Sequence, residues 1–321
     1  MSLAVESQGV TVRVPGKINL ELVVGPRRDD GYHELATIFH TVGIYDYVTA
    51  TEADAWSVQV SGPTAEGVPT NASNLALKAA KMLARRFDID GAVALGIEKN
   101  IPVAGGMAGG SADAAAALVA CETLWGLEQS RDDLEPFAAR LGSDVPFLLH
   151  GGTAIGSGRG ERLAPVLARG ELNWVLWVSP DAGLSTPEVY AECDRLRESA
   201  GVDVPDPVPS GDLMAALRTM HPAEVGAALR NDLQDAAVSL RPVIGDVIEA
   251  GTSLGALGAV VSGSGPTVAF LVGTQAEAID LSVGLAARGP TGDIRRATGP
   301  VAGAQVIQSV APTGGPQNFT G

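Results

Sequence analysis

The chain has 321 residues, with 37 acidic and 22 basic side chains and a formal net charge of −15 at pH 7. This negative balance argues against binding to a nucleic-acid backbone, which requires a basic face, although it is compatible with a local basic pocket for a smaller anion. Hydrophobic residues make up 45% and charged residues 18%, as in ordinary globular proteins, and no apolar run approaches the roughly 18 residues of a membrane span.

The cysteines and the N-terminal residues indicate where the protein works. Cys121 and Cys193 have no near neighbour of metal-ligand type, so neither a disulfide scaffold nor a structural zinc site is expected. The first residues lack the basic segment and apolar core of a secretory signal. We therefore predict a cytoplasmic protein that binds neither nucleic acid nor a membrane.

The first elements of the chain are expected to be β-strands. Alternating residues at 10–14, followed by the apolar segment 15–24, predict a strand, a kink and a second strand, with Lys17 at the kink. A lysine is most often a solvated surface residue. This chain has only four lysines against eighteen arginines, however, and Lys17 lies among apolar β-formers, so a functional role stays open.

Residues 29–35 predict a turn that presents an aromatic ring beside an imidazole, on Tyr32 and His33. Stacking together with a hydrogen-bond donor and acceptor would suit a heterocyclic base. The alternative is a tyrosine packed at the edge of the core and a histidine at the surface. The expected elements that follow are strands at 36–42 and 47–60, an amphipathic helix at 74–87 and a strand at 93–98.

A glycine-rich loop then precedes an alanine-rich run at 111–121. Its glycines permit backbone conformations in which N–H groups turn inward and leave room for an anion; they are Gly105, Gly106, Gly109 and Gly110. The alanine-rich run predicts a helix with Ser111 as its N-cap, and the free N–H groups and positive dipole end of such a helix suit phosphate. The spacing excludes both the Walker and the Rossmann loops. A nucleotide loop of another type and a flexible surface loop remain the two interpretations.

Asp144 is expected in a turn ahead of an apolar strand, where most aspartates serve as caps. The other expected elements are helices at 134–141, 212–220, 222–229, 242–254 and 275–287, a hairpin at 151–166, strands at 173–179, 259–261, 267–272 and 306–310, an exposed connection at 201–211 and a disordered tail at 311–321.

Five segments together resemble one family. Residues 15–20, 102–112 and 262–266 are similar, in order and spacing, to the three motifs of the galactokinase, homoserine kinase, mevalonate kinase and phosphomevalonate kinase (GHMP kinase) superfamily. Residues 31–35 and 142–147 resemble one branch of it, the 4-diphosphocytidyl-2-C-methyl-D-erythritol kinases of the non-mevalonate isoprenoid pathway. The resemblance spans nearly the whole chain.

This resemblance implies an α+β fold of two domains with the active site between them. Residues 1–168 would form an ATP-binding and catalytic domain of the ribosomal protein S5 domain 2-like type. Residues 169–310 would form a ferredoxin-like, substrate-binding domain. Periodicity alone supports only a mixture of helices and strands.

The resemblance also implies transfer of the γ-phosphoryl group of ATP, with Mg²⁺, to the 2-hydroxyl of a small molecule, 4-diphosphocytidyl-2-C-methylerythritol. Asp144 would be the base that takes the hydroxyl proton. Lys17 would keep Asp144 ionised and stabilise the developing charge. Tyr32 would stack on cytosine, and His33 would hydrogen-bond the edge of the base. A monomer or weak homodimer is expected, and the metal ligands are unassigned.

Further residues are carried over by position. The ATP site would comprise Asn74 near the adenine, with Pro102, Gly105, Gly106, Gly109, Gly110 and Ser111 around the phosphates. The acceptor site would comprise Asn19, Lys99, Thr186, Gly263 and Gly265.

Two positions depart from the pattern of the family's glycine loop, and an acidic residue follows them. Relatives commonly have glycine where Ala108 stands and serine where Ala112 stands. Ala108 disfavours a positive φ, and Ala112 lacks a hydroxyl for phosphate or metal. Asp113 would repel phosphate if it faced the loop, so it is expected to point away or to engage Mg²⁺ through water.

Two other functions are considered. One is a GHMP kinase for another small alcohol, of the homoserine or mevalonate type, which would have no use for the base-binding pair Tyr32 and His33. The other is a non-catalytic nucleotide-binding regulator, against which the retention of Lys17 and Asp144 argues.

Overall fold

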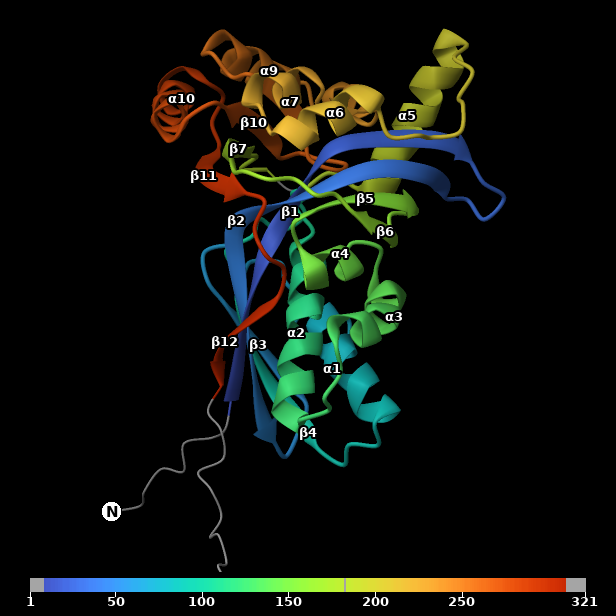
Figure 1. Cartoon of the computed structure of the whole chain (residues 1–321), viewed down its shortest axis with the longest axis vertical. Helices are drawn as coiled ribbons and strands as arrows, with labels where there is room; N and C mark the ends of the chain where they lie inside the picture. Colours follow the sequence, from blue (N-terminus) through green and yellow to red (C-terminus); the bar gives the residue numbers. More distant parts are fainter. Residues whose placement is uncertain (1–8, 182, 310–321) are drawn as a thin grey trace, which may run out of the picture.

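Two β-sheets organise the chain in a computed structural model that describes residues 9–181 and 183–309. The first sheet has eight strands, with β12-β1-β2-β4-β3 in order and β5, β6 and β8 joined beside them, and the second is a four-stranded sheet in the order β11-β7-β10-β9. Helices cover both sheets, so the α+β class is confirmed (Figure 1). Among the described residues, no helix is long and apolar enough to cross a membrane.

The bounds of the elements are as follows. The strands are β1 (Gly9–Arg27), β2 (His33–Ala53), β3 (Ser57–Ser61), β4 (Ala92–Glu98), β5 (Thr153–Gly158), β6 (Arg162–Pro165), β7 (Leu172–Val178), β8 (Arg230–Asn231), β9 (Gly258–Val261), β10 (Val268–Val272), β11 (Asp293–Gly299) and β12 (Gln305–Ser309). The helices are α1 (Leu75–Arg86), α2 (Gly109–Trp125), α3 (Arg131–Leu141), α4 (Val145–His150), α5 (Thr186–Ala200), α6 (Gly211–Thr219), α7 (Pro222–Ala227), α8 (Gln234–Leu240), α9 (Val243–Ser253) and α10 (Gln275–Arg288).

Strands β1 and β2 form a long antiparallel pair that runs through both halves of the molecule (Figure 1). The predicted strand, kink and second strand are one strand, β1, whose register with β2 shifts between Pro15 and Gly16 and again between Asn19 and Glu21. Proline cannot donate to a ladder and is tolerated at such a bulge, and bulges re-aim the side chains beside them. Lys17 and Asn19 lie between the two shifts and, two residues apart, on one face.

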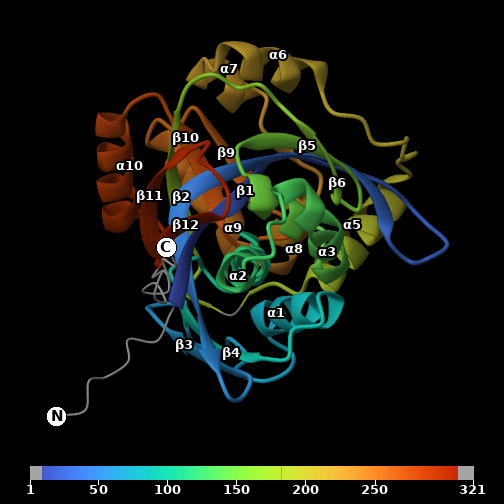
Figure 2. The same ribbon diagram turned by 60° about the horizontal axis from the view of Figure 1, so that its bottom comes forward.

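Helix α2 is the centre of the first half. Its residues from Ala112 to Cys121 are all buried, and its small side chains let the neighbouring β1, β2, α1, α3 and α4 approach closely. Figure 2 shows α2 nearly end-on, enclosed by α1, α3 and the curved pair β1 and β2. The helix begins at Gly109 with Ala108 as N-cap, so the expectation that Ser111 caps it is wrong by about one turn.

The second sheet has the topology of the ferredoxin-like fold. Its strands follow one another along the chain as β7, β9, β10 and β11, with helices between β7 and β9 and between β10 and β11. This is the β-α-β-β-α-β arrangement, and it confirms the expected ferredoxin-like part. Its sheet buries Trp174, Trp177 and Phe270.

Later segments of the chain also join the first sheet. Strand β12 pairs with the start of β1, and the short β8 pairs with β1 in parallel, with Asn231 opposite Leu22. The expected domain boundary at 168–169 falls between β6 and β7 and stays a prediction. The tail expected at 311–321 lies outside the described residues.

Several elements differ from the expectations. The segment after Asp144 is the helix α4 instead of a strand, because a short apolar run has no periodicity to distinguish the two, and Pro146 fits the first turn of a helix. Helices α5 and α8 and strand β11 were not predicted. Strand β12 begins at Gln305, one residue before the expected 306–310, and residue 310 lies outside the described residues.

Candidate active site

The two glycine-rich segments, far apart in the sequence, are in direct contact. The Ser262 hydroxyl donates to the Gly106 carbonyl at 3.0 Å, and the Thr267 N–H donates to the Gly105 carbonyl at 3.3 Å. Gly106 has a φ of +80°, and a Cβ at this position would lie 1.9 Å from the Ser262 carbonyl oxygen. Glycine is therefore required where the two halves of the molecule meet.

The start of α2 holds its backbone in an unusual conformation. Ala108 has φ 59° and ψ 34°, which is left-handed despite its Cβ, and Ala104 has φ 53°. This conformation costs roughly 1–2 kcal/mol per L-residue, and such strain concentrates at functional sites. The first N–H groups of α2, at Gly109, Gly110 and Ser111, have no partner within the helix, and these residues line a cavity. They form a site suited to an anion.

This inner cavity has a volume of about 400 Å³ and gathers residues from β1, the glycine loop, α4, α5 and the second glycine turn. It brings together ten of the predicted site residues: Lys17, Asn19, Gly105, Gly106, Gly109, Gly110, Ser111, Asp144, Thr186 and Gly263.

Lys17 is buried at the wall of the inner cavity with a neutral hydrogen-bond partner. Its Nζ donates to Asn19 Oδ1 at 2.8 Å, Asn19 Nδ2 donates to Thr37 Oγ1 at 2.8 Å, and Thr37 Oγ1 donates to the Glu21 carbonyl at 2.6 Å. Burial lowers the pKa of Lys17 below its ordinary value, and the charge of Asp144 opposes that shift. The chain of bonds fixes the ammonium and, within the part of the chain that the structure describes, leaves its charge without a bonded counter-ion.

Asp144 stands at the N-cap position of α4, yet its side chain makes no capping hydrogen bond. Its carboxylate forms no ion pair with Lys17 among the described residues, and both side chains line the same cavity. The aspartate is thus free of the capping role that most such residues fill. A carboxylate and an ammonium face one space that has room for a ligand.

A second, outer cavity of about 690 Å³ adjoins the first and contains the predicted base-binding pair. Tyr32 is 57% exposed, and His33 is buried, with Nε2 2.9 Å from Asp194 Oδ1 and its ring 5.1 Å from that of Tyr190. Tyr190 and Asp194 are four residues apart and therefore share one face of α5. Neither residue was expected at the site from the sequence, because helix α5 was not predicted.

The second glycine turn is held by residues around it. Asn231 Nδ2 donates to the carbonyls of Val261 and Gly263, both at 2.7 Å, and the hydroxyls of Thr186 and Ser264 are 2.9 Å apart. Asn231 was not singled out from the sequence because its segment carries no recognisable motif. The turn is thus fastened to both β8 and the start of α5.

Comparison with known proteins agrees with this geometry. The family GHMP kinases N terminal domain matches residues 74–152, and GHMP kinases C terminal matches residues 213–291. Proteins called 4-diphosphocytidyl-2-C-methyl-D-erythritol kinase in Mycolicibacterium vanbaalenii and Mycobacterium tuberculosis are 52% and 51% identical to the chain, each over 97% of it and 96% of the relative. This chain is a member of that GHMP kinase family. A crystal structure of 4-(cytidine 5'-diphospho)-2C-methyl-D-erythritol kinase matches 91% of the chain and 100% of its own, with a TM-score of 0.73 and 31% identity.

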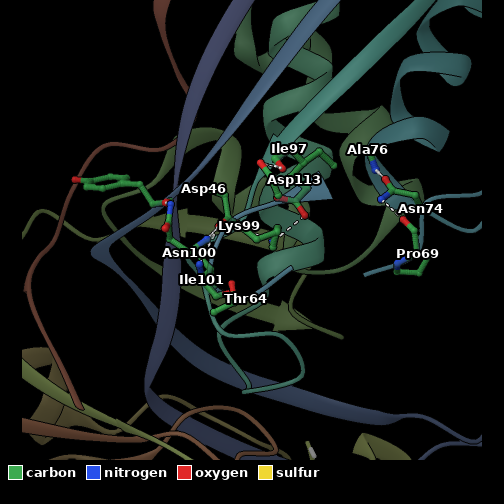
Figure 3. A network of polar contacts seen from close by, with 12 residues as sticks. Asp46, Thr64, Pro69, Asn74, Ala76, Ile97, Lys99, Asn100, Ile101 and Asp113 are labelled. Carbon is green, nitrogen blue, oxygen red and sulfur yellow. Dashed lines mark hydrogen bonds and ion pairs between the residues drawn. The ribbon is translucent and has the colours of Figure 1, made fainter. Parts of the chain in front are cut away.

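In this GHMP kinase, Lys99 does not line either cavity, so its predicted place at the acceptor is corrected. It is 1% exposed, and its Nζ bridges the carboxylates of Asp46 and, at 2.8 Å, Asp113 (Figure 3). Asp46 also accepts the N–H groups of Asn100 and Ile101 at 2.6 and 2.8 Å. Two buried carboxylates compensate the charge of Lys99 and hold its side chain outside the cavity.

Asp113 lines neither cavity and pairs with Lys99, in agreement with the expectation that it does not face bound phosphate. Burial lowers the pKa of Lys99, but the two carboxylates outweigh this effect and raise it overall. Burial raises the pKa of Asp113 to about 7, with Lys99 opposing the rise. Asp113 Oδ1 is buried without a hydrogen-bond partner among the described residues. The network fastens the end of β4 to α2 beneath the loop.

Three other predicted residues support the site from behind. Asn74 caps α1: its Oδ1 accepts the N–H groups of Ala76 and Leu77 at 2.9 and 3.2 Å, and its Nδ2 donates to the Pro69 carbonyl at 2.8 Å (Figure 3). These bonds engage the amide as a helix cap, and the assignment of Asn74 to the adenine site stays a prediction. Pro102 and Gly265 likewise do not line either cavity. Pro102 is buried and packs beneath the loop, and Gly265 has a φ of +79° that shapes the second turn.

Proposed function

We propose that this kinase transfers the γ-phosphoryl group of ATP to the 2-hydroxyl of 4-diphosphocytidyl-2-C-methyl-D-erythritol, giving the 2-phosphate of the non-mevalonate isoprenoid pathway. One observation carries the proposal. The inner cavity, with its lysine, aspartate and helix N-terminus, adjoins an outer cavity that presents a tyrosine and a histidine. An acceptor with a base at one end and an alcohol at the other fits this pair of cavities.

The transfer step uses Asp144 and Lys17. The acceptor hydroxyl oxygen forms a bond to the γ-phosphorus, the bond from that phosphorus to the bridging oxygen breaks, and ADP leaves. Asp144 takes the hydroxyl proton, and the Lys17 ammonium stabilises the negative charge on the transferring group. Phosphoryl transfer asks a protein mainly for alignment and charge stabilisation, which two fixed groups facing one cavity supply.

The glycine loop is assigned to the phosphates of ATP. The N–H groups at the start of α2 have no partner in the helix, and its positive dipole end favours negative charge. The close approach at Gly106 leaves the backbone bare of side chains where a phosphate would lie. The loop therefore fits a nucleotide triphosphate.

Mg²⁺, which GHMP kinases generally use with ATP, fits the donors of the inner cavity. The ion binds through one or two carboxylates together with phosphate oxygens and waters. Asp144 is the one carboxylate and Ser111 one of the hydroxyls among the cavity-lining residues. The Ser111 hydroxyl would hold the ion beside the phosphates, with Asp144 left to the acceptor hydroxyl, and the charge of the ion would offset that of the transferring group. Asp113, paired with Lys99, is not available to it.

The cytosine of the acceptor is assigned to the outer cavity. Asp194 holds Nε2 of His33, which leaves Nδ1 as an acceptor if the proton lies on Nε2. An acceptor suits the amino group of cytosine, while the exposed ring of Tyr32 offers a stacking surface. Homoserine and mevalonate have no base, so a kinase for either would leave this cavity without a purpose. A regulator without turnover would not need Asp144 free of its cap.

An ADP-release assay across a panel of alcohols tests the proposal. We expect turnover with the cytidyl-linked methylerythritol and none above background with homoserine or mevalonate. Activity with homoserine and none with the cytidyl compound would overturn it. ATP binding without ADP release on any acceptor would favour the regulator.

A further inference from the structure

Arg159 lies at the tip of the hairpin between β5 and β6 and lines both cavities. The other cations of the site do not do so. Arg27 and Arg140 line only the outer cavity, and Lys17 lines only the inner one. Among the residues that line the two cavities, Arg159 is thus the cation at the junction between the outer cavity, assigned to cytosine, and the inner cavity, assigned to phosphoryl transfer.

The tip of the hairpin is held in one conformation. Gly158 and Gly160 on either side have φ values of +76° and +108°, and the Gly160 N–H donates to the Ser157 carbonyl at 3.1 Å. The Arg159 N–H donates to Glu161 Oε2 at 2.8 Å. A Cβ on Gly160 would lie 3.2 Å from Cζ of Phe39, so the tip packs closely against β2. The backbone that carries Arg159 is therefore fixed before any ligand binds.

The guanidinium of Arg159 has no carboxylate at ion-pair distance among the residues described at 9–181 and 183–309. Its neighbours do: Arg28 and Arg162 both pair with Glu34, each at 3.0 Å. Arg159 instead stands over the ring of Tyr32, 5.3 Å from the centroid. An arginine on an aromatic face keeps its planar set of N–H donors for a ligand, and this set matches phosphate oxygens.

We propose that Arg159 binds the diphosphate that joins the base to the alcohol, and that it makes the enzyme select diphosphate-linked acceptors over neutral nucleosides. The inference rests on the proposed function, which puts the base in the outer cavity and the hydroxyl in the inner one. The diphosphate lies between those two groups in the covalent structure of the acceptor. It must therefore pass the residues shared by the two cavities, which are Leu35, Ser143, Arg159, Thr186 and Tyr190. Among these only Arg159 is charged.

The test compares the binding of cytidine 5'-diphosphate and of cytidine by calorimetry. Wild-type protein is expected to bind the diphosphate roughly 10- to 100-fold more tightly, the worth of charge-assisted hydrogen bonds. Arg159→Ala should lose most of this preference while its affinity for cytidine changes little. Arg159→Lys should keep part of it, because a lysine retains the charge without the planar donors. Arg86→Ala, which removes a positive charge from α1 outside both cavities, is the matched control.

Failure of the inference and failure of the proposed function give different results. If wild-type protein binds both compounds and Arg159→Ala keeps the full preference, the role of Arg159 is overturned and the proposed function stands. Equal weakening of both compounds in Arg159→Ala also overturns it, since the arginine would then act only by orienting Tyr32. If wild-type protein binds neither compound, the proposed function falls and the inference falls with it.

Discussion

Two lysines are buried beside the glycine-rich segments, and the partners of their charges differ. Lys17 is 4% exposed and Lys99 is 1% exposed. Lys17 Nζ has a neutral partner, Asn19, and lies where a Cβ on Gly263 would be 3.3 Å away. Lys99 Nζ has two carboxylates and lies 3.1 Å from where a Cβ on Gly109 would be. Burial lowers the pKa of Lys17, and the carboxylates raise that of Lys99.

The difference shows that burial does not by itself identify a functional cation. An ammonium taken out of water is costly unless it is compensated. At Lys99 the protein supplies the compensation, so the charge serves to hold β4 and α2 together. At Lys17 the hydrogen-bond partner is an amide oxygen and no carboxylate among the described residues lies at ion-pair distance, so the charge is left for the ligand. Lys99 therefore serves stability, and we assign Lys17 to activity.

The largest expected effect is the loss of turnover when a residue of the inner cavity is substituted. Asp144→Asn keeps the shape of the side chain but removes its ability to take a proton. We expect kcat to fall roughly 10²- to 10⁴-fold, the usual contribution of a general base, while ATP binding survives. Steady-state kinetics and calorimetry with ATP measure the two quantities. Turnover like that of the wild type would end the assignment of Asp144 as the base.

The second prediction concerns the contribution of the buried Lys99 network to stability. Lys99→Met leaves Asp46 and Asp113 buried without their cation, and breaking a buried pair in this way typically costs about 3–5 kcal/mol. Urea denaturation should show a loss of that size in the free energy of unfolding. Lys78→Met, on the exposed face of α1, is the control and should change it by less than about 0.5 kcal/mol. Equal stabilities of the two variants would contradict the role given to Lys99.

A smaller effect is expected in the outer cavity. Tyr32→Ala removes the ring assigned to cytosine, and stacking of a base on an aromatic ring is worth roughly 1–3 kcal/mol. The KM for the cytidyl acceptor should therefore rise while that for ATP changes little. Tyr32→Phe keeps the ring and should preserve the KM. If the KM values for both substrates rise equally in Tyr32→Ala, the site assigned to the base is wrong.

The smallest effect is a change in the pH dependence of stability. The carboxyl of Asp113 has a pKa of about 7 in the folded protein against an ordinary value of 3.8. Between these values the folded state holds a proton that the unfolded state has lost, so this group's contribution to stability falls as pH rises. Asp113→Asn removes that term. The free energy of unfolding of the variant, relative to that of the wild type, should therefore increase as pH rises from about 4 to about 7. A difference that stays constant over this range would contradict the pKa shift.

Much of the site was predictable because its residues sit in local motifs. Lys17, Asn19, Asp144 and the glycines of the loop lie beside recognisable turns, and the structure gathers them at the inner cavity. Sequence reasoning could not separate Lys99 from a cavity residue. The partner that decides its orientation, Asp46, is 53 residues away, and pairing over that distance leaves no local pattern.

The fold was predictable where periodicity is strong and less so elsewhere. Helix α4 is formed by a short apolar run whose pattern is compatible with either a helix or a strand. Pro146 lies in its first turn, a position that favours the helix. Helix α5 carries charged residues over much of its surface and was not expected, so Tyr190 and Asp194 escaped notice. At Ala108 the packing of the whole loop outweighs the local preference against a positive φ.

The most direct test of the account is the variant Lys17→Met, measured for both turnover and stability. If this lysine is kept for the ligand, kcat should fall roughly 10²-fold or more, as when a preorganised charge-stabilising group is lost. The free energy of unfolding should stay the same or rise, since the variant no longer buries an ammonium that lacks an ion-pair partner among the described residues. Turnover that survives, or a loss of stability as large as that of Lys99→Met, would contradict the distinction between the two lysines.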